Sequence, residues 1–210
     1  MAGPVTVAAV LLTTNYELRT KKINVPLRDS KKLSPKQREF WFDYIKKQKI
    51  PYAVANVSQK IIDRINISNA ANLAATRALN KLLTTNKKLL TPTPLGRGSN
   101  RSVGAINCRV YLDGGLKISP KFSKSLLANG YTLNTIIRGD EKISAIMFAS
   151  IVAKVRRDNL MKRVHKKYPR YGFKKHKGYG TKLHYRALKL NGASKIHRKS
   201  FLSSLKKEGR

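Results

Sequence analysis

The stretch from Asn134 to Asp158 constrains the fold more than any other part of this sequence. A short apolar pair ends at Gly139, and Asp140 follows at once. The next residues place apolar side chains at the 3.6-residue period of an α-helix, at Ile143, Ile146, Met147, Ile151 and Val155. Alanine and serine lie beside this stripe, so another element can approach closely. We therefore expect a long buried helix with a carboxylate just before it.

A second carboxylate, Asp113, ends the strand-like run 108–112 and precedes two glycines. Aspartate before a helix is a common N-terminal cap, and Asp-Gly after a strand is a common turn, so each residue alone fits a structural role. The chain, however, has 45 Lys and Arg against only 10 Asp and Glu, a net charge of +35. In so basic a chain, we expect carboxylates at the ends of apolar segments to hold a cation.

The excess of positive charge indicates an anionic polymer as the partner. A membrane surface is the rival anion, but no single basic amphipathic helix concentrates the charge, so we predict nucleic acid and no membrane. The apolar run 5–12 is too short to span a bilayer and is expected to form a buried strand. The single cysteine, Cys108, excludes an internal disulfide and a multi-cysteine zinc site. We expect a cytoplasmic monomer.

Strand-like and helix-like segments are mixed along the chain without an internal repeat, which predicts a single α/β domain with a mixed sheet. The expected strands are 4–13, its hairpin partner 17–25, 52–57, 108–112 and 131–137. One expected helix starts at Pro35, after the N-cap Ser34. The other expected helices cover 58–66, 68–83, 119–129, 143–168 and 182–191. Residues 84–107 lack periodicity and are expected to form a long loop. We place the core in residues 1–168 and a small basic C-terminal helical extension in residues 169–210.

Residues 171–181 combine three glycines with lysines and with the aromatic side chains of Tyr171, Phe173 and Tyr179. Cations for phosphates and flat faces for sugars or bases are what a nucleic-acid groove needs. The alternative is a solvated basic loop whose aromatic side chains attach it to the core. The residues alone do not decide between these two interpretations.

Six short pieces of the chain match, in order, the motifs of a known family. They are Asp29-Ser30-Lys31-Lys32-Leu33, Ile65-Asn66-Ile67, Leu112-Asp113-Gly114, Gly139-Asp140, Ala149-Ser150-Ile151-Val152-Ala153-Lys154-Val155 with Arg157-Asp158, and His176-Lys177-Gly178-Tyr179-Gly180-Thr181. Together they resemble ribonuclease HII, the bacterial type 2 ribonuclease H. The match runs from residue 3 to residue 201, and its specificity comes from the ordered set rather than from any one piece.

The resemblance implies a ribonuclease H-like fold, with a mixed sheet flanked by helices. It also implies endonucleolytic cleavage of RNA in RNA–DNA hybrids, including single ribonucleotides embedded in duplex DNA. The family holds two Mg²⁺ or Mn²⁺ ions with four carboxylates, and such hard cations prefer oxygen ligands. By motif position, Asp113 and Asp140 correspond to the third and fourth of these catalytic carboxylates.

The resemblance also implies residues that contact the nucleic acid. Tyr179 matches the tyrosine that packs on the sugar next to the ribonucleotide junction. Lys31, Asn66 and Lys154 match polar positions near the nucleic-acid backbone. We expect the neighbouring lysines of two matched pieces, Lys32 and Lys177, to contact phosphates as well.

The sequence departs from the family pattern at its start. The family carries Asp-Glu-Ala-Gly-Arg-Gly shortly before the segment that corresponds to Ala2-Gly3-Pro4-Val5, and the printed sequence does not contain those residues. We therefore expect the printed chain to lack two of the four carboxylates, to bind nucleic acid and to cleave hybrid very slowly. The alternatives are a non-catalytic hybrid-binding protein of the same fold and a basic structural RNA-binding protein. The last of these would leave Asp113 and Asp140 without a role.

Overall fold

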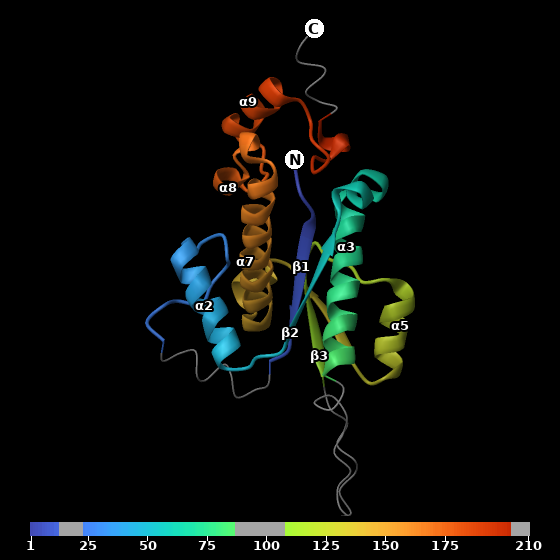
Figure 1. Cartoon of the computed structure of the whole chain (residues 1–210). Coiled ribbons are helices and arrows are strands. Elements are labelled where there is room, and N and C mark those ends of the chain that lie inside the picture. Colours follow the sequence, from blue (N-terminus) through green and yellow to red (C-terminus); the bar gives the residue numbers. More distant parts are fainter. Residues whose placement is uncertain (13–22, 87–107, 203–210) are drawn as a thin grey trace, which may run out of the picture.

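The structure is a computed structural model that describes residues 1–12, 23–86 and 108–202. Within these residues, four strands form two small sheets, and helices flank them (Figure 1). The antiparallel sheet contains β1 (Val5–Val10) and β2 (Tyr52–Val57), and the parallel sheet contains β3 (Arg109–Asp113) and β4 (Thr132–Ile136). The expected α/β class, with both strand orientations present, is confirmed.

Two long helices cover opposite faces of β1, as Figure 1 shows. One is α7 (Ser144–Lys167), and the other is α3 (Gln59–Thr85). Helix α2 (Pro35–Lys47) packs on the outside of α7, and α5 (Pro120–Ala128) connects β3 to β4. The alternation of strands and helices predicted from the sequence therefore gives layers, with the strands inside.

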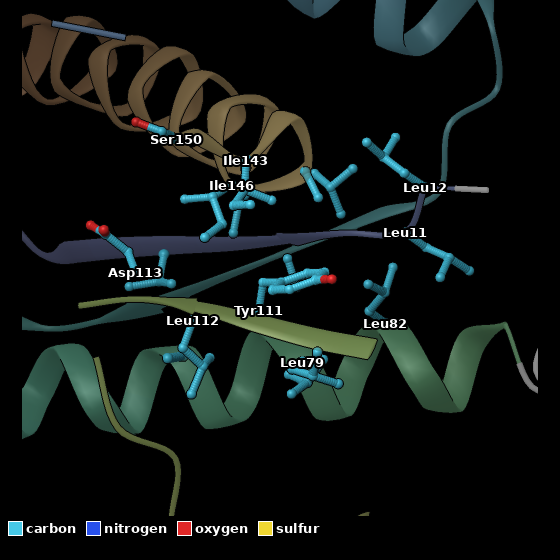
Figure 2. A pocket seen from close by; sticks show the side chains of 18 of the residues that line it. Leu11, Leu12, Leu79, Leu82, Tyr111, Leu112, Asp113, Ile143, Ile146 and Ser150 are labelled. Carbon is cyan, nitrogen blue, oxygen red and sulfur yellow. The ribbon is translucent and has the colours of Figure 1, made fainter. Parts of the chain in front are cut away.

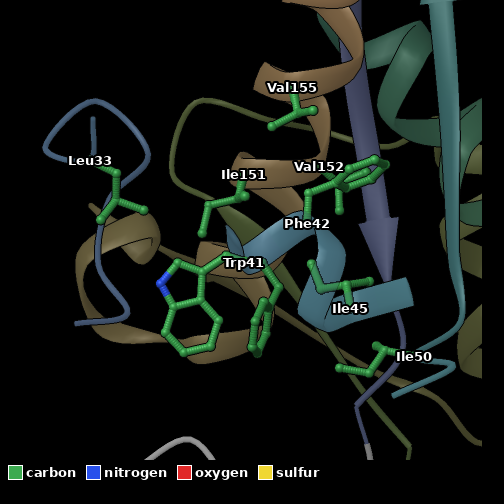
Figure 3. Close-up of a cluster of buried hydrophobic side chains, with 9 residues drawn as sticks. Leu33, Trp41, Phe42, Ile45, Ile50, Ile151, Val152 and Val155 are labelled. Carbon is green, nitrogen blue, oxygen red and sulfur yellow. The ribbon is translucent and has the colours of Figure 1, made fainter. Parts of the chain in front are cut away.

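The largest hydrophobic cluster joins α2 to α7 (Figure 3). Trp41 is fully buried, and its ring meets that of Phe148 edge-on at a centroid distance of 5.6 Å. Figure 3 shows Ile45 and Phe42 of α2 beside the same stretch of α7. Trp41 and Phe42 of α2 are therefore core residues, whereas Phe40 on the same helix is 42% exposed.

Helix starts were predicted well because local capping chemistry sets them. Ser34 accepts a hydrogen bond from the Gln37 amide, and the Gln37 side chain accepts one from the Ser34 amide, which is a complete capping box before Pro35. Ser119 accepts a bond from the Phe122 amide at the start of α5. Thr181 caps α9 (Lys182–Asn191), which has the bounds expected from the sequence.

Two expectations about the first half of the chain are corrected. The partner of β1 is β2, in a register from Val5 opposite Val57 to Val10 opposite Tyr52, and not the segment 17–25. Residues 23–25 form no strand, and residues 13–22 lie outside the described residues. This pairing spans about 50 residues of sequence, so no local turn signal could reveal it. The predicted loop 84–107 begins with two helical residues, and most of it is likewise outside the described part.

Asp140 does not directly precede α7. It lies in a separate turn, α6 (Gly139–Lys142), because Ile143 has extended backbone angles (φ −115°, ψ 116°) that interrupt the helix. The two helical segments predicted at 58–66 and 68–83 are continuous in α3 but kinked at Asn66, whose φ is +64°. Both breaks are short and fall beside motif residues.

The C-terminal part packs on the end of α7 and on the first residues of the chain. It contains η1 (Pro169–Tyr171), α8 (Phe173–His176), α9 and η2 (Lys199–Phe201). Its apolar cluster includes Tyr171, Phe173 and Met161, together with Ala2. A domain boundary at residue 168 stays a prediction. None of the helices described is long and apolar enough to cross a membrane.

Candidate metal and nucleic-acid site

Asp113 is the last residue of β3, and two backbone amides hold its carboxylate. The Oδ1 atom accepts hydrogen bonds from the amides of Gly114 and Gly139, each at 3.0 Å. The second bond joins the end of β3 to the start of α6, just before Asp140. Because β3 and β4 are parallel, their carboxyl ends lie at one edge of the sheet, and this brings the predicted pair of aspartates to the rim of one cavity, where Figure 2 shows Asp113.

Gly139 makes this close approach possible because it has no side chain. A Cβ atom at this position would lie 2.4 Å from Cδ1 of Ile146 and 3.6 Å from Oδ1 of Asp113. The glycine is buried between the end of β4 and the first turn of α7. The predicted Gly-Asp motif therefore has a steric reason as well as a chemical one.

Lys31 points at the same carboxylates. Its Nζ lies 3.5 Å from Oδ2 of Asp140, and its own amide is held by Oδ1 of Asp29 at 2.9 Å. The charges of Asp29, Asp140 and Asp113 raise the pKa of the Lys31 ammonium. The Lys31 side chain is 79% exposed, so its ion pair with Asp140 contributes little to the stability of the fold. The pair instead indicates that the electrostatic potential beside Asp140 is negative.

The turn that carries Lys31 is fixed to α7 by a hydrogen bond between two serines. The hydroxyls of Ser30 and Ser150 lie 2.6 Å apart, and Ser30 is almost fully buried. Sequence reasoning did not select either serine as a site residue, although both stand inside matched motif pieces. Their contact holds those two pieces side by side in the structure.

Lys32, predicted to bind nucleic acid, lies beside Glu141. The Glu141 carboxylate pairs with Lys32 at 2.9 Å and with Arg138 at 2.7 Å, and these hydrogen bonds hold its pKa below the usual range. Glu141 therefore already has two cationic partners. Within residues 1–12, 23–86 and 108–202, no group of three or more His, Cys, Asp or Glu side chains could hold a metal ion.

The chemistry of Asp113 and Asp140 nevertheless fits a hard divalent cation. Both offer carboxylate oxygens, the ligands that Mg²⁺ and Mn²⁺ prefer. The hydrogen bonds that the Gly114 and Gly139 amides donate to Asp113 both go to one oxygen, Oδ1, so the carboxylate is oriented without losing its charge. The side chain of Asp140 is 14% exposed, which leaves it accessible at the cavity rim.

Tyr179 is exposed and lies against two cations. Its ring is 5.1 Å from Nζ of Lys154 and 4.8 Å from Cζ of Arg157, and the residue is 50% exposed. Tyr171 and Phe173, in contrast, are buried. Tyr171 and Phe173 therefore attach the 171–181 segment to the core, whereas Tyr179 is exposed, and its contact with nucleic acid stays a prediction.

Lys154 and Arg157 lie on the face of α7 that also carries Ser150. Lys154 is further tied to Asp158 at 3.1 Å. From Ser150 to Arg157 the helix rises about 10 Å, at ~1.5 Å per residue, which matches about three stacked nucleotides. Arg157 was missed in the sequence analysis, although its spacing of three residues from Lys154 is a helical-face signal.

Gly178 fixes the position of Tyr179. Its φ is +81°, and a Cβ atom there would lie 2.5 Å from the carbonyl oxygen of Ala2. The Ala2 amide donates to the Gly178 carbonyl at 3.0 Å, so the N-terminal segment and this loop are in direct contact. The neighbouring Lys177, whose φ is +51°, ends α8, and its ammonium donates to the carbonyl of Lys174.

Asn66 lies apart from the carboxylates. Its Oδ1 accepts a hydrogen bond from the Asn69 amide at 2.9 Å and so caps the second segment of α3. It lines a separate hollow of about 730 Å³ together with Asp63 and Ser200. The structure thus gives Asn66 a helix-capping contact, and its predicted contact with nucleic acid remains a prediction.

Comparison with known proteins agrees with the motif order. The family model described as Ribonuclease HII matches residues 1–94 and 106–204. A Ribonuclease HII from Caldicellulosiruptor bescii is 40% identical over 205 residues, which cover 98% of this chain and 82% of the relative. Another, from Endomicrobium trichonymphae, is 40% identical over 204 residues, which cover 96% of this chain and 79% of the relative.

Solved structures show the same fold. A chain in the PCNA:RNase HII complex from Archaeoglobus fulgidus superposes with a TM-score of 0.63 at 22% identity, covering 94% of this chain and 87% of that chain. The ribonuclease H2 of Pyrococcus horikoshii OT3 superposes with a TM-score of 0.61 at 22% identity, covering 98% of this chain and 90% of that chain. A Bst-RNase HIII in complex with Mn²⁺ superposes with a TM-score of 0.57 at 15% identity, covering 91% of this chain and 58% of that chain. The expected ribonuclease H-like fold is confirmed.

Proposed function

The chain belongs to the ribonuclease HII family, and on this premise we propose that it cleaves the RNA of RNA–DNA hybrids, including single ribonucleotides embedded in duplex DNA. The observation that carries the proposal is the placement of Asp113 and Asp140 at one rim, with Asp113 oriented by the Gly139 amide. The net charge of +35 supports a nucleic-acid substrate.

Asp113 and Asp140 would hold Mg²⁺ or Mn²⁺. Such ions, when bound, activate water and stabilise the departing oxygen of the phosphodiester. The amides of Gly114 and Gly139 orient the Asp113 carboxylate before any ion arrives. Lys31, whose ammonium approaches Asp140, would move to a substrate phosphate when a metal cation takes its place beside the carboxylates.

Tyr179 would pack on a sugar or base beside the cleaved bond. Lys154 and Arg157 approach its ring, so the ring has a defined position and its surroundings are cationic. Lys32 and Lys177 would add phosphate contacts.

A second candidate is a protein of the same fold that binds hybrid and does not cleave it. One observation favours it: in the part of the chain that the structure describes, only two carboxylates meet at the rim and no group of three does. Two divalent ions held by only two carboxylates would repel each other strongly.

A gel assay on a DNA duplex with one embedded ribonucleotide separates the two candidates. The printed chain and its Asp113→Asn variant are compared in Mg²⁺ and in Mn²⁺, with an all-DNA duplex as control. Cleavage at the ribonucleotide that is lost in the variant supports the nuclease. Tight binding of hybrid with no product by either protein supports the binding protein.

A further inference from the structure

Three buried histidines lie beside the loop that presents Tyr179. His176 ends α8, His184 lies in the first turn of α9, and His197 follows α9, so all three belong to the C-terminal part at the end of α7 (Figure 1). Their exposed fractions are 8%, 0% and 3%. The proposed function gives them no role. Buried imidazoles need hydrogen-bond partners for both ring nitrogens, so their partners are informative.

The backbone groups around two of these rings determine which nitrogen carries the proton. In His176, Nδ1 accepts a hydrogen bond from the Gly178 amide at 3.2 Å, and Nε2 lies 2.6 Å from the carbonyl oxygen of Tyr171, so Nε2 carries the proton. In His184, Nδ1 lies 2.9 Å from the carbonyl oxygen of Tyr179, so Nδ1 carries the proton and Nε2 of the neutral ring accepts. The two rings therefore hold the Gly178 amide and the Tyr179 carbonyl.

His197 completes a continuous arrangement of hydrogen bonds, which we call the histidine network (His176, His184 and His197). Its Nδ1 accepts a bond from the Ser194 amide at 2.9 Å, and the Ser194 hydroxyl lies 2.9 Å from the same atom. The proton of the neutral ring is therefore on Nε2, which donates to Nε2 of His184 at 3.0 Å. This placement of protons satisfies all the ring nitrogens of the network with three neutral rings.

No negative charge compensates a proton added to the histidine network. The ring of His184 stacks on that of His176 at a centroid distance of 4.4 Å and meets the buried ring of Phe173 edge-on. The charged or titratable groups around the network are the Met1 amino group, His165 on α7, Lys177 after α8, the Tyr171 phenol and the Arg198 guanidinium. None of them is a carboxylate, and within the described part of the chain no carboxylate bonds to these rings. Burial therefore lowers the pKa of all three imidazoles, that of His184 to about 4.

We propose that the histidine network positions Tyr179, and that protonation of the network releases the loop that presents this tyrosine. A proton on Nδ1 of His176 would face the N–H of Gly178, and a proton on Nε2 of His184 would face the N–H of His197. Each added proton thus replaces a hydrogen bond by a repulsion between two donors, and the charged ring requires water. The contact of Tyr179 with nucleic acid rests on the proposed function, whereas the tautomers and the release of the loop do not.

Nitrogen-15 NMR of the imidazole side chains tests the network in the unmodified protein. At about pH 7.5 we expect His184 to be the Nδ1–H tautomer, and His176 and His197 to be the Nε2–H tautomer. The two tautomers have different ring-nitrogen shifts, so this mixed pattern is directly recognisable. His184 in the Nε2–H form, or charged at this pH, would overturn the proposal.

Amide hydrogen exchange measures the release of the loop. When the loop opens, the pKa of His184 returns from about 4 to about 6.5, so the opening constant rises roughly 30-fold between pH 7.5 and pH 5. The protection factors of the Gly178 and Tyr179 amides, corrected for intrinsic exchange, should fall by at least that factor. The Ile50 amide, which bonds to the Ile45 carbonyl in the cluster of α2 and α7, is the internal control. An equal fall at Ile50, or none at Gly178, would overturn the proposal.

Two variants assign the pH dependence to the network. His184→Asn keeps a side-chain N–H near the place of Nδ1 but does not titrate, so the fall in protection should become smaller by about 10-fold or more. His165→Gln removes the one histidine of the sequence outside the network and should leave the fall unchanged. A fall that persists in full in His184→Asn would assign it to another group, such as the Met1 amino group, and would overturn the proposal.

Hybrid affinity connects the network with the proposed function. In fluorescence anisotropy at about pH 7.5, Tyr179→Ala and His184→Ala should each weaken binding of an RNA–DNA hybrid about 10-fold, and the double variant should be hardly weaker than either. If Tyr179→Ala leaves the affinity unchanged while the tautomers and the exchange are as expected, the network stands and the proposed role of Tyr179 fails. If Tyr179→Ala weakens binding and His184→Ala does not, the network does not position Tyr179 and the proposal fails.

Discussion

Replacing Gly139 with alanine adds one methyl group at the most crowded point of the site. The new Cβ would lie 2.4 Å from Cδ1 of Ile146, well inside any normal carbon–carbon contact. Ile146 is itself buried and cannot move into solvent. Removing this clash therefore requires a rotamer change of Ile146 or a shift of the α6 backbone. The backbone shift would also lengthen the hydrogen bond from the amide at position 139 to Asp113.

Overpacking of this kind costs about 1–3 kcal/mol of unfolding free energy. Ile146→Val removes the Cδ1 atom that the new methyl group meets, and alone costs about 0.5–1.5 kcal/mol for the lost burial. In the double variant the two changes compensate. We expect the double variant to be at least as stable as Gly139→Ala alone. The coupling energy between the two substitutions would then offset about 1 kcal/mol or more of their summed cost.

Urea denaturation of the wild type, both single variants and the double variant measures this cycle, provided that the m-value stays constant. Gly115→Ala is the matched control, because among the described residues no atom lies within 4 Å of the place that its Cβ would take. Its effect should stay below about 1 kcal/mol. Strictly additive costs of the two substitutions would refute the reasoning, since they would show that Ile146 is not what excludes a side chain at position 139.

Asp113→Asn should weaken Mn²⁺ binding by about 10-fold or more in calorimetry, as even outer-shell changes do, and unchanged affinity would exclude this residue as a ligand. Tyr179→Ala should cost about 1–3 kcal/mol of hybrid affinity in fluorescence anisotropy, and an equal loss on all-DNA duplex would contradict the junction role. Burial lowers the pKa of His184 to about 4, below its unfolded value of about 6.5. Its contribution to stability is therefore complete above about pH 6.5 and is lost as pH falls toward 4, so denaturation of His184→Leu should depend less on pH over that range.

The elements that the sequence predicted best are those with local determinants. The starts of α2 and α5 were predicted closely because a serine followed by a proline marks each of them. The expected bounds of α9 agree with the structure, in which Thr181 caps the first turn. The pairing of β1 with β2 depends on packing between distant segments, so the sequence pattern indicated each strand but not its partner.

For the site, the motif pieces indicated which residues belong together but not how they do so. The spacing of Lys31 and Asp140 gives no sign that their charged groups meet, and Ser30 and Ser150 carry no chemistry that would single them out. Burial, which only the fold decides, separated Tyr179 from Tyr171. A monomeric state and a cytoplasmic location remain predictions.

The contact between Ala2 and Gly178 also has a consequence for the order of folding. The loop that presents Tyr179 takes its shape from a hydrogen bond that closes almost the whole length of the chain. Such non-local contacts form late, because most of the loop-closure entropy must be lost before they add stability. During synthesis, the first residues emerge long before residue 178 exists. A growing chain therefore cannot fix the position of Tyr179 through this contact until residue 178 has been synthesised.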